Sequence, residues 1–260
     1  MNFMNLDEQY RKPNSKFVII PKPIEGDVSY GKGSNKGPEE IIKASKQLEY
    51  YDEQFDQEPF LKGIITADTF NKDQFPIFLG GDHSITINAV KEVEGHQDDF
   101  SVIILDAHPD CFHSWNNSTE NHRCTTQRLS EKHKTLVVGV RSMDRDEIEI
   151  INNNEDINII KSYDYNEDKL KNQLNNLKDK VYISIDVDVF DPSFIRNTGT
   201  PEPGGFTWDQ VINMLNIIFK NKNVIGSDIV EFAPTENFRA EAYSLAKLAH
   251  KIMALKNLKH

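Results

Sequence analysis

The stretch SVIILDAHPD (101–110) joins a run of apolar, β-branched residues to a cluster of acidic and imidazole side chains. Such a short run is typical of a strand that is covered on both faces. Similar runs occupy residues 17–20, 75–79, 135–140, 157–160, 181–185 and 224–230. Between them, helical spacing extends over residues 38–50, 84–95, 122–132, 144–153, 166–178, 208–220 and 237–256. This alternation predicts an α/β fold with a mainly parallel sheet and helices on both faces.

Two of the predicted helices have a recognisable start. Pro38 follows Gly37 and is expected at the first helical position, where its missing N–H is not needed. Thr207 precedes WDQVINML and is expected to be an N-cap.

Length and charge limit the class of protein. The 260 residues carry 30 Lys and Arg against 41 Asp and Glu, a formal net charge of −11. This acidity argues against a nucleic-acid binder and against an anionic membrane surface, since both need basic patches. It is compatible with a small cationic partner. Because no repeat or low-complexity linker interrupts the pattern, we expect one domain over residues 1–260.

Targeting signals and cysteine content indicate where the protein is expected to be located. No apolar run approaches the ~20 residues that span a bilayer, and the start MNFMNLDEQY lacks the regions of a signal peptide. Two cysteines, Cys111 and Cys124, do not make a disulfide framework. We therefore expect a cytoplasmic protein with reduced thiols.

Three strand ends carry an unusual set of side chains. GGDHS (80–84) follows one apolar run, DAHPD (106–110) follows the next, and DVDVFDP (186–192) follows VYISI. An ordinary loop after a strand would carry only one or two turn residues. In open α/β sheets, ligands bind outside the carboxyl ends of the strands, so these motifs mark the candidate site.

The spacing inside the motifs brings acids and imidazoles together. Residues two apart on an extended segment point to the same side, which places Asp106 beside His108. Asp186 and Asp188 repeat this spacing on another strand. We expect convergence of four carboxylates and two imidazoles, from His83, Asp106, His108, Asp110, Asp186 and Asp188.

Such a cluster needs a counter-charge, because repulsion and desolvation would otherwise force the carboxylates to take up protons. Six ligands exceed the about four of a tetrahedral zinc site. An oxygen-rich set with two imidazoles suits two Mn²⁺ ions, which would lower the pKa of a shared water and make a hydrolase. Asp191 is instead interpreted as a turn residue before proline, and Asp82 as a support for His83 or for a backbone group.

The three motifs, in this order and at these separations, resemble the signatures of the ureohydrolase family, which includes arginase, agmatinase and formimidoylglutamase. Further family-like stretches are YGKGSNKGPEEIIKASKQLEYYD (30–52), GVRSMDRDE (139–147), GTPEPGGFTW (199–208) and DIVEFAPTEN (228–237). The resemblance covers almost the whole chain. It implies a three-layer α/β/α fold, two Mn²⁺ ions and a homo-oligomer, usually a trimer or hexamer.

The resemblance also assigns roles to the strand-end residues. One ion is implied to bind His83, Asp106, Asp110 and Asp186. The other is implied to bind His108, Asp106, Asp186 and Asp188. Asp106 and Asp186 would therefore bridge the two ions.

Three catalytic roles follow from the same resemblance. Glu231 matches the acid that binds the substrate guanidinium. His122 matches the histidine that assists proton transfer, with Asp188 relaying the proton to the leaving amine. His113 is a rival for His122, and Arg123 stands where arginases carry Gly.

The substrate is predicted from the loops. The loop CFHSWNNSTENH (111–122) does not resemble the arginase loop that binds the amino-acid part of arginine, whereas NTGTPEPGG (197–205) resembles agmatinases. We expect hydrolysis of agmatine to putrescine and urea, a step of polyamine biosynthesis. Arginase, guanidinobutyrase and formimidoylglutamase activities stay open, the last because Arg123 is a possible partner for substrate carboxylates.

Two remoter alternatives are weighed beside this one. A deacetylase-like amidohydrolase uses one zinc and would not need the GGDH and D-x-D motifs together. A non-catalytic nucleotide binder would use GKGSNKG (31–37), but this stretch lacks the ending of a P-loop and is interpreted as a loop at the substrate rim. Phe112 and Trp115 are candidates for shaping the substrate channel. Cys111 is expected to be a small buried thiol, and only an exposed one would make metal binding sensitive to oxidation.

Overall fold

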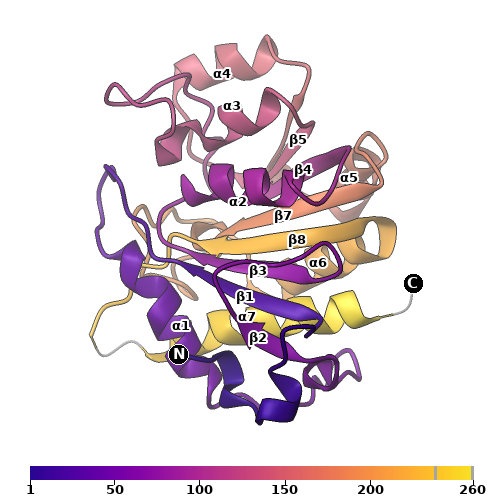
Figure 1. Ribbon diagram of the computed structural model, residues 1–260. Helices are drawn as coiled ribbons and strands as arrows, with labels where there is room; N and C mark the ends of the chain where they lie inside the picture. The colour runs from indigo at the N-terminus through magenta and orange to yellow at the C-terminus, as the bar shows by residue number, and fades with distance from the viewer. Residues whose placement is uncertain (237–238, 259–260) are drawn as a thin grey trace.

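The computed structural model describes residues 1–236 and 239–258, and within them eight strands form one sheet (Figure 1). The strands are β1 (Phe17–Lys22), β2 (Ile64–Thr66), β3 (Phe75–Gly80), β4 (Phe100–Leu105), β5 (Thr135–Val140), β6 (Ile157–Lys161), β7 (Lys180–Asp186) and β8 (Asn223–Val230). They lie in the order β2-β1-β3-β8-β7-β4-β5-β6, and every pairing is parallel.

The helices alternate with the strands along the chain. The α-helices are α1 (Gly37–Ser45), α2 (Ile85–Glu94), α3 (Thr125–Ser130), α4 (Arg145–Asn152), α5 (Glu167–Leu174), α6 (Trp208–Asn221) and α7 (Arg239–Asn257). Short 3-10 helices are η1 (Phe3–Asn5), η2 (Glu8–Tyr10), η3 (Ser34–Lys36), η4 (Pro59–Lys62), η5 (His122–Cys124), η6 (Ser162–Asp164) and η7 (Val187–Val189). No helix in the described part of the chain is long and apolar enough to cross a membrane.

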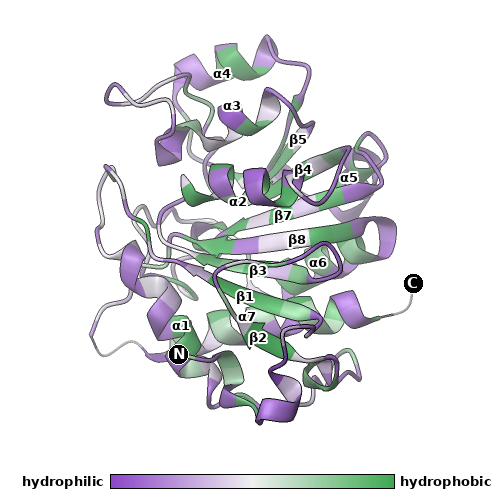
Figure 2. Cartoon of the chain, in the orientation of Figure 1, coloured by the Kyte–Doolittle hydropathy of each residue, from purple (hydrophilic) through white to green (hydrophobic). Residues whose placement is uncertain are grey.

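Two apolar cores lie on opposite faces of the sheet, because successive strand residues point to opposite sides. On β1, Phe17 and Ile19 belong to one core, whereas Val18 and Ile20 belong to the other. Residues of α1, α5, α6 and α7 complete the first core, and residues of α2 and α3 complete the second. The hydropathy colouring shows the strands as mainly apolar segments between helices with polar outer sides (Figure 2). The predicted three-layer α/β/α architecture is confirmed.

The element predictions hold with local differences. All seven predicted strands are present, and Thr207 caps α6 by accepting the N–H of Gln210. Strand β2 was not predicted, because its three residues are too few to give a clear pattern. Pro38 lies in the first turn of α1, but the helix begins one residue earlier, at Gly37, and ends at Ser45. The predicted helix over 122–132 begins as the 3-10 turn η5, and residues 237–238 of the last predicted helix lie outside the described residues.

The topology brings the motif-bearing strand ends together. Strands β3, β8, β7 and β4 are consecutive neighbours in the sheet. Their carboxyl ends therefore form one continuous edge, although β3 and β8 are far apart in the sequence. The last residue of β7 and the loops that follow β3, β4 and β7 carry every residue predicted to bind metal.

Candidate metal centre and active-site cavity

The loop after β3 is shaped by two glycines and Asp82. A Cβ on Gly81 would lie 1.8 Å from the carbonyl oxygen of Ile24, so only glycine fits there. The Asp82 carboxylate accepts the backbone N–H of Gly26 and, at 2.9 Å, that of Ser84. Asp82 thus supports backbone groups, which is one of the two roles predicted for it, and the loop holds His83 above the sheet edge.

The loop after β4 turns sharply at its last acid. Asp110 has a φ of 50°, a left-handed conformation that Asp tolerates better than most residues. Its carbonyl oxygen accepts the N–H of Thr126 at 3.0 Å, which ties the loop to the start of α3. Asp106 accepts the N–H of His108 at 2.6 Å, so these two residues are fixed relative to each other.

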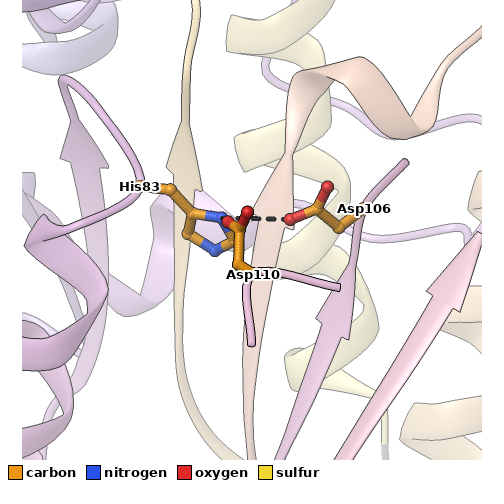
Figure 3. A group of neighbouring side chains, drawn as sticks. All are labelled: His83, Asp106 and Asp110. Atoms are coloured by element: carbon orange, nitrogen blue, oxygen red, sulfur yellow. Dashed lines mark hydrogen bonds and ion pairs between the residues drawn. The ribbon is translucent and has the colours of Figure 1, made fainter. Parts of the chain in front are cut away.

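His83 lies among three carboxylates, and Figure 3 shows two of them, those of Asp106 and Asp110. Its Nδ1 is 3.0 Å from Asp106 Oδ2, 3.0 Å from Asp110 Oδ2 and 3.5 Å from Asp186 Oδ2. The His83 side chain is 1% exposed. The structure thus brings together the four residues that the sequence assigns to the first ion.

His108 forms the second half of the cluster. Its Nδ1 is 2.9 Å from Asp188 Oδ2 and 3.6 Å from Asp106 Oδ1. Asp106 therefore faces both imidazoles, one through each carboxylate oxygen. Asp186 is less symmetrical, because its Oδ1 accepts the N–H of Asp188 while its Oδ2 faces His83.

Burial and mutual repulsion dominate the charge state of the cluster. Burial, followed by the neighbouring charge of Asp188, raises the pKa of Asp106 and raises that of Asp186 well above its usual range. Burial also lowers the pKa of His108, but the charges of Asp188 and Asp106 outweigh it and raise the pKa overall. These shifts show that gathering the carboxylates has an electrostatic cost, which bound cations would offset.

This donor set fits divalent ions. Within the described residues, two groups of side chains converge closely enough to hold an ion: His83, Asp106 and Asp110, and Asp106, His108 and Asp188. Asp106 Oδ2 is buried and accepts no hydrogen bond, which leaves a lone pair available for a metal. Each group offers carboxylate oxygens and one imidazole. Such donors suit octahedral ions, whereas structural zinc prefers sulfur-rich donors.

A hydrogen-bonded chain behind His83 fixes its ring. His83 Nε2 lies 3.1 Å from Ser184 Oγ, which donates to Asp228 Oδ1 at 2.6 Å. Tyr182 donates to the other oxygen of Asp228 at 2.8 Å. Since the Ser184 proton is used on Asp228, His83 Nε2–H is the donor to Ser184, and this contact directs Nδ1 toward the carboxylates. Sequence reasoning missed this chain, although Ser184 and Asp228 are polar residues inside otherwise apolar strands.

A cavity of about 270 Å³ opens above the cluster. Four predicted ligands line it, together with Glu231 and His122, whereas His83 and Asp106 are not among the lining residues. The lining ligands are His108, Asp110, Asp186 and Asp188. Glu231 directly follows β8 with a φ of 66°, and its Oε1 accepts the N–H of His83 at 2.7 Å. Burial and the charge of Asp82 raise the pKa of Glu231 well above its usual range.

The two candidate proton-transfer histidines lie in different places. His122 lines this cavity, and its Nε2 lies 2.9 Å from Ser29 Oγ. Burial lowers the pKa of His122. His113 is exposed and lines a separate hollow beside α4. The geometry therefore favours His122, and Ser29 is a neighbour that the sequence did not reveal.

Arg123 forms an ion pair and two aromatic contacts within the protein. Its Nη2 is 2.8 Å from Asp144 Oδ2, and its guanidinium stacks over Trp115 at 4.0 Å and Phe112 at 4.6 Å. Arg123 lines the cavity, but the two aromatic rings do not. Phe112 and Trp115 thus support Arg123 from behind, which agrees with a role in loop packing and gives them no direct place on the cavity wall. The Cys111 thiol is fully buried, and burial raises its pKa, so it is the inert thiol expected by default.

Comparison with known proteins gives the family. A family model described as the arginase family matches residues 64–255 of this chain. The chain belongs to the arginase family. Membership explains why the three strand-end motifs occur together, and it makes this chain a ureohydrolase rather than a deacetylase-like enzyme.

Two relatives are similar to this chain over most of their length. The chain is 33% identical to the N(1)-aminopropylagmatine ureohydrolase of Synechocystis sp., covering 91% of this chain and 87% of the relative. It is 32% identical to the agmatinase of Pyrococcus horikoshii, covering 93% and 92%. Among solved structures, the agmatine ureohydrolase of Thermoplasma volcanium has a TM-score of 0.82 at 26% identity, covering 94% of this chain and 90% of that one.

Proposed function

We propose that this arginase-family ureohydrolase converts agmatine and water to putrescine and urea. The observation that supports this most is the combination of an ion-binding cluster, Glu231 and His122 in one cavity with an acidic rim. The cluster suits hydrolysis, and the rim suits a substrate with a second positive charge.

Two divalent ions would be held by the ligands that the sequence predicts. The donors are His83, Asp106, Asp110 and Asp186 for one ion and His108, Asp106, Asp186 and Asp188 for the other. When bound, such ions make water a stronger nucleophile near neutral pH and offset negative charge that develops in the reaction. Mn²⁺ is the ion that we propose.

Glu231 is proposed to orient the guanidinium. One of its oxygens is held by the N–H of His83, and a Cβ on Gly199 would come within 3.5 Å of the other, so the carboxylate is fixed in direction. A guanidinium is planar and donates paired hydrogen bonds to a carboxylate. Its positive charge would also compensate the buried negative charge of Glu231.

Proton transfer completes the reaction. Water adds its oxygen to the guanidino carbon, the bond from this carbon to the alkyl nitrogen breaks, and that nitrogen takes a proton as it leaves. Asp188 is proposed to carry this proton and His122 to resupply it. The lowered pKa of His122 makes its protonated form a better donor.

The charges at the cavity rim favour an amine over a carboxylate on the substrate. Outside the cluster and Glu231, the lining residues include three acids, Asp144, Glu147 and Glu202, and one arginine. That arginine, Arg123, is paired with Asp144. Burial raises the pKa of Glu147 to about 7, so the negative charge beyond the Arg123–Asp144 pair is mainly that of Glu202. A substrate carboxylate would meet this charge, which argues against arginine, guanidinobutyrate and formimidoylglutamate as preferred substrates.

A second candidate substrate is N(1)-aminopropylagmatine. Relatives of this name are 33%, 31% and 30% identical to the chain. This compound carries one more ammonium than agmatine, and an acidic rim suits both. The products would be urea and the corresponding triamine.

Product release from a substrate panel tests the proposal. Mn²⁺-loaded protein is given agmatine, N(1)-aminopropylagmatine, arginine and 4-guanidinobutyrate with urea as the readout, and formimidoylglutamate with formamide as the readout. We expect the highest kcat/KM for one of the two amine-bearing guanidines. If fully metallated protein releases no urea from any guanidino compound, the proposed function is wrong.

The family resemblance further predicts a homo-oligomer, and the two unpaired cysteines favour a cytoplasmic location. Light scattering coupled to size-exclusion chromatography distinguishes a trimer or hexamer from a monomer.

A further inference from the structure

The second ring nitrogen of His108 faces a carboxylate that no motif predicted. His108 Nε2 lies 3.7 Å from Glu202 Oε1, and both side chains border the cavity. Ligating histidines commonly direct their other N–H to a carboxylate or carbonyl, which fixes the ring. Glu202 occupies that side of the His108 ring at ion-pair distance, whereas Ser184 is within hydrogen-bond distance of His83.

Glu202 lies in a loop, so its position depends on what holds the loop. Its carbonyl oxygen accepts Arg141 Nη2 at 2.8 Å, and the carbonyl oxygen of Pro203 accepts Arg141 Nε at 3.1 Å. Arg141 directly follows β5, a strand of the central sheet. The loop is therefore anchored to a rigid element by the arginine side chain.

The same guanidinium holds the other partner of His108. Arg141 Nη2 donates to the carbonyl oxygen of Asp188 at 2.6 Å, and Nη1 donates to that of Gly139 at 3.3 Å. Asp188 is the residue whose carboxylate meets His108 Nδ1. One arginine thus fixes the main chain of both residues that flank the His108 ring.

Packing around the guanidinium leaves little freedom. A Cβ on Gly205 would lie 2.7 Å from Arg141 Nη2 and 2.5 Å from the amide nitrogen of Asp191. The loop therefore packs closely against the arginine. Lysine could not replace it, because a single ammonium cannot reach carbonyl groups on three separate segments.

We propose that Arg141 and Glu202 are positioning residues that hold His108 and Asp188 as one half of the metal centre. The inference rests on the proposed two-ion site. It assigns Arg141 to the backbone of this half and Glu202 to the orientation of the imidazole. Neither residue is required by the His83 half, which is supported by Ser184 and Asp228.

Titration of the metal-free full-length chain with Mn²⁺ tests the assignment, with no substrate present. We expect Glu202→Gln and Arg141→Lys to reduce the affinity for one of the two ions by about 10–100-fold and to leave the affinity for the other unchanged. Glu149 is an exposed acid of α4, so Glu149→Gln is the matched control and should bind both ions normally.

Double variants identify which ion is affected. In a His108→Ala background, Glu202→Gln should not weaken the remaining ion further. In a His83→Ala background, it should weaken the remaining ion by the same factor as in the wild type. The metal-free Tm of Glu202→Gln should equal that of the wild type, because the Arg141 contacts are to the main chain and persist.

Other outcomes would overturn the inference. Unchanged binding of both ions in Glu202→Gln, or equal weakening of both with a lower metal-free Tm, contradicts a role specific to His108. If Arg141→Lys fails to fold, Glu202→Gln decides alone. A wild-type chain that binds no Mn²⁺ would refute the metal centre itself, and this inference with it.

Discussion

The His83 and His108 halves of the cluster use the same chemistry in different surroundings. Both imidazoles meet carboxylates through Nδ1. The side chain of His83 is 1% exposed and is backed by hydroxyl groups inside the sheet, whereas that of His108 is 23% exposed and is backed by a loop. The difference shows that one half is fixed by the core and the other by the wall of the cavity.

This difference has a functional meaning. A half that is built into the sheet is rigid, because its supporting groups cannot move without disrupting the core. A half that borders the cavity can respond to what enters it. In the proposed reaction, the His108 half also contains Asp188, the residue to which we assign proton transfer.

Asp106→Asn should have the largest effect, because Asp106 is the carboxylate that faces both imidazoles. Loss of a supporting residue typically reduces metal affinity by about 10–100-fold. In Asp106→Asn the affinity for both ions should fall further than this, and activity should be lost. Metal analysis after dialysis is the measurement. Asp186→Asn is the matched comparison and is also expected to weaken both ions. Full retention of two ions in Asp186→Asn would contradict its bridging role.

Withdrawal of divalent ions should lower the free energy of unfolding, since four buried carboxylates then repel one another. At a free Mn²⁺ concentration of 100 times Kd, each site should add about 2.7 kcal/mol. Denaturant unfolding with Mn²⁺ and with a chelator measures the difference. His83→Ala should remove the gain of one site only, and an unfolding curve that Mn²⁺ does not shift would contradict the two-ion centre.

Ser184→Ala should affect only the His83 half, because Ser184 supports His83 from the core of the protein. The affinity for the ion bound by His83 should fall by about 10–100-fold, while the affinity for the ion bound by His108 stays unchanged. Because Asp228 is buried and loses a donor, the metal-free chain should also lose about 1–3 kcal/mol of stability. Glu202→Gln should show no such loss, so the pair of variants distinguishes a core support from a wall support. Equal effects of the two variants on both ions would remove the distinction.

Ser29→Ala should have the smallest effect. Ser29 Oγ lies 2.9 Å from His122 Nε2 at the cavity wall, and neither residue meets the cluster of carboxylates. Loss of one exposed hydrogen bond of about 0.5–1.5 kcal/mol should reduce kcat by about 2–10-fold. Mn²⁺ binding should be unchanged, and a change in it would show that this contact acts on the metal centre.

The sequence predicted the parts of the molecule that have a local pattern. Buried parallel strands are apolar runs, so seven of them were visible, and the acids that follow β4 and β7 are two residues apart. The three-residue β2 has no such pattern. Its place at the sheet edge depends on pairing with β1, which is a long-range contact.

The supports of the site could not be predicted in the same way. Ser184 and Asp228 are 44 residues apart and meet because β7 and β8 pair. Arg141 and Glu202 are 61 residues apart and meet only through loop packing. A polar residue inside an apolar strand was a signal for the first pair. For the second pair the only signal was that both residues lie in family-like stretches, 139–147 and 199–208, which gave neither residue a role or a partner.

The position of β8 constrains when the site can exist. This last strand inserts between β3 and β7, so the loops that carry His83 and Asp106 belong to opposite sides of the sheet until it is in place. Without residues 223–230, His83 therefore lies on a different sheet fragment from the other five predicted ligands, which follow or end the paired strands β4 and β7. The proposed His83 ion would then be bound only after the final strand is in place, whereas the His108 group needs only β4 and β7.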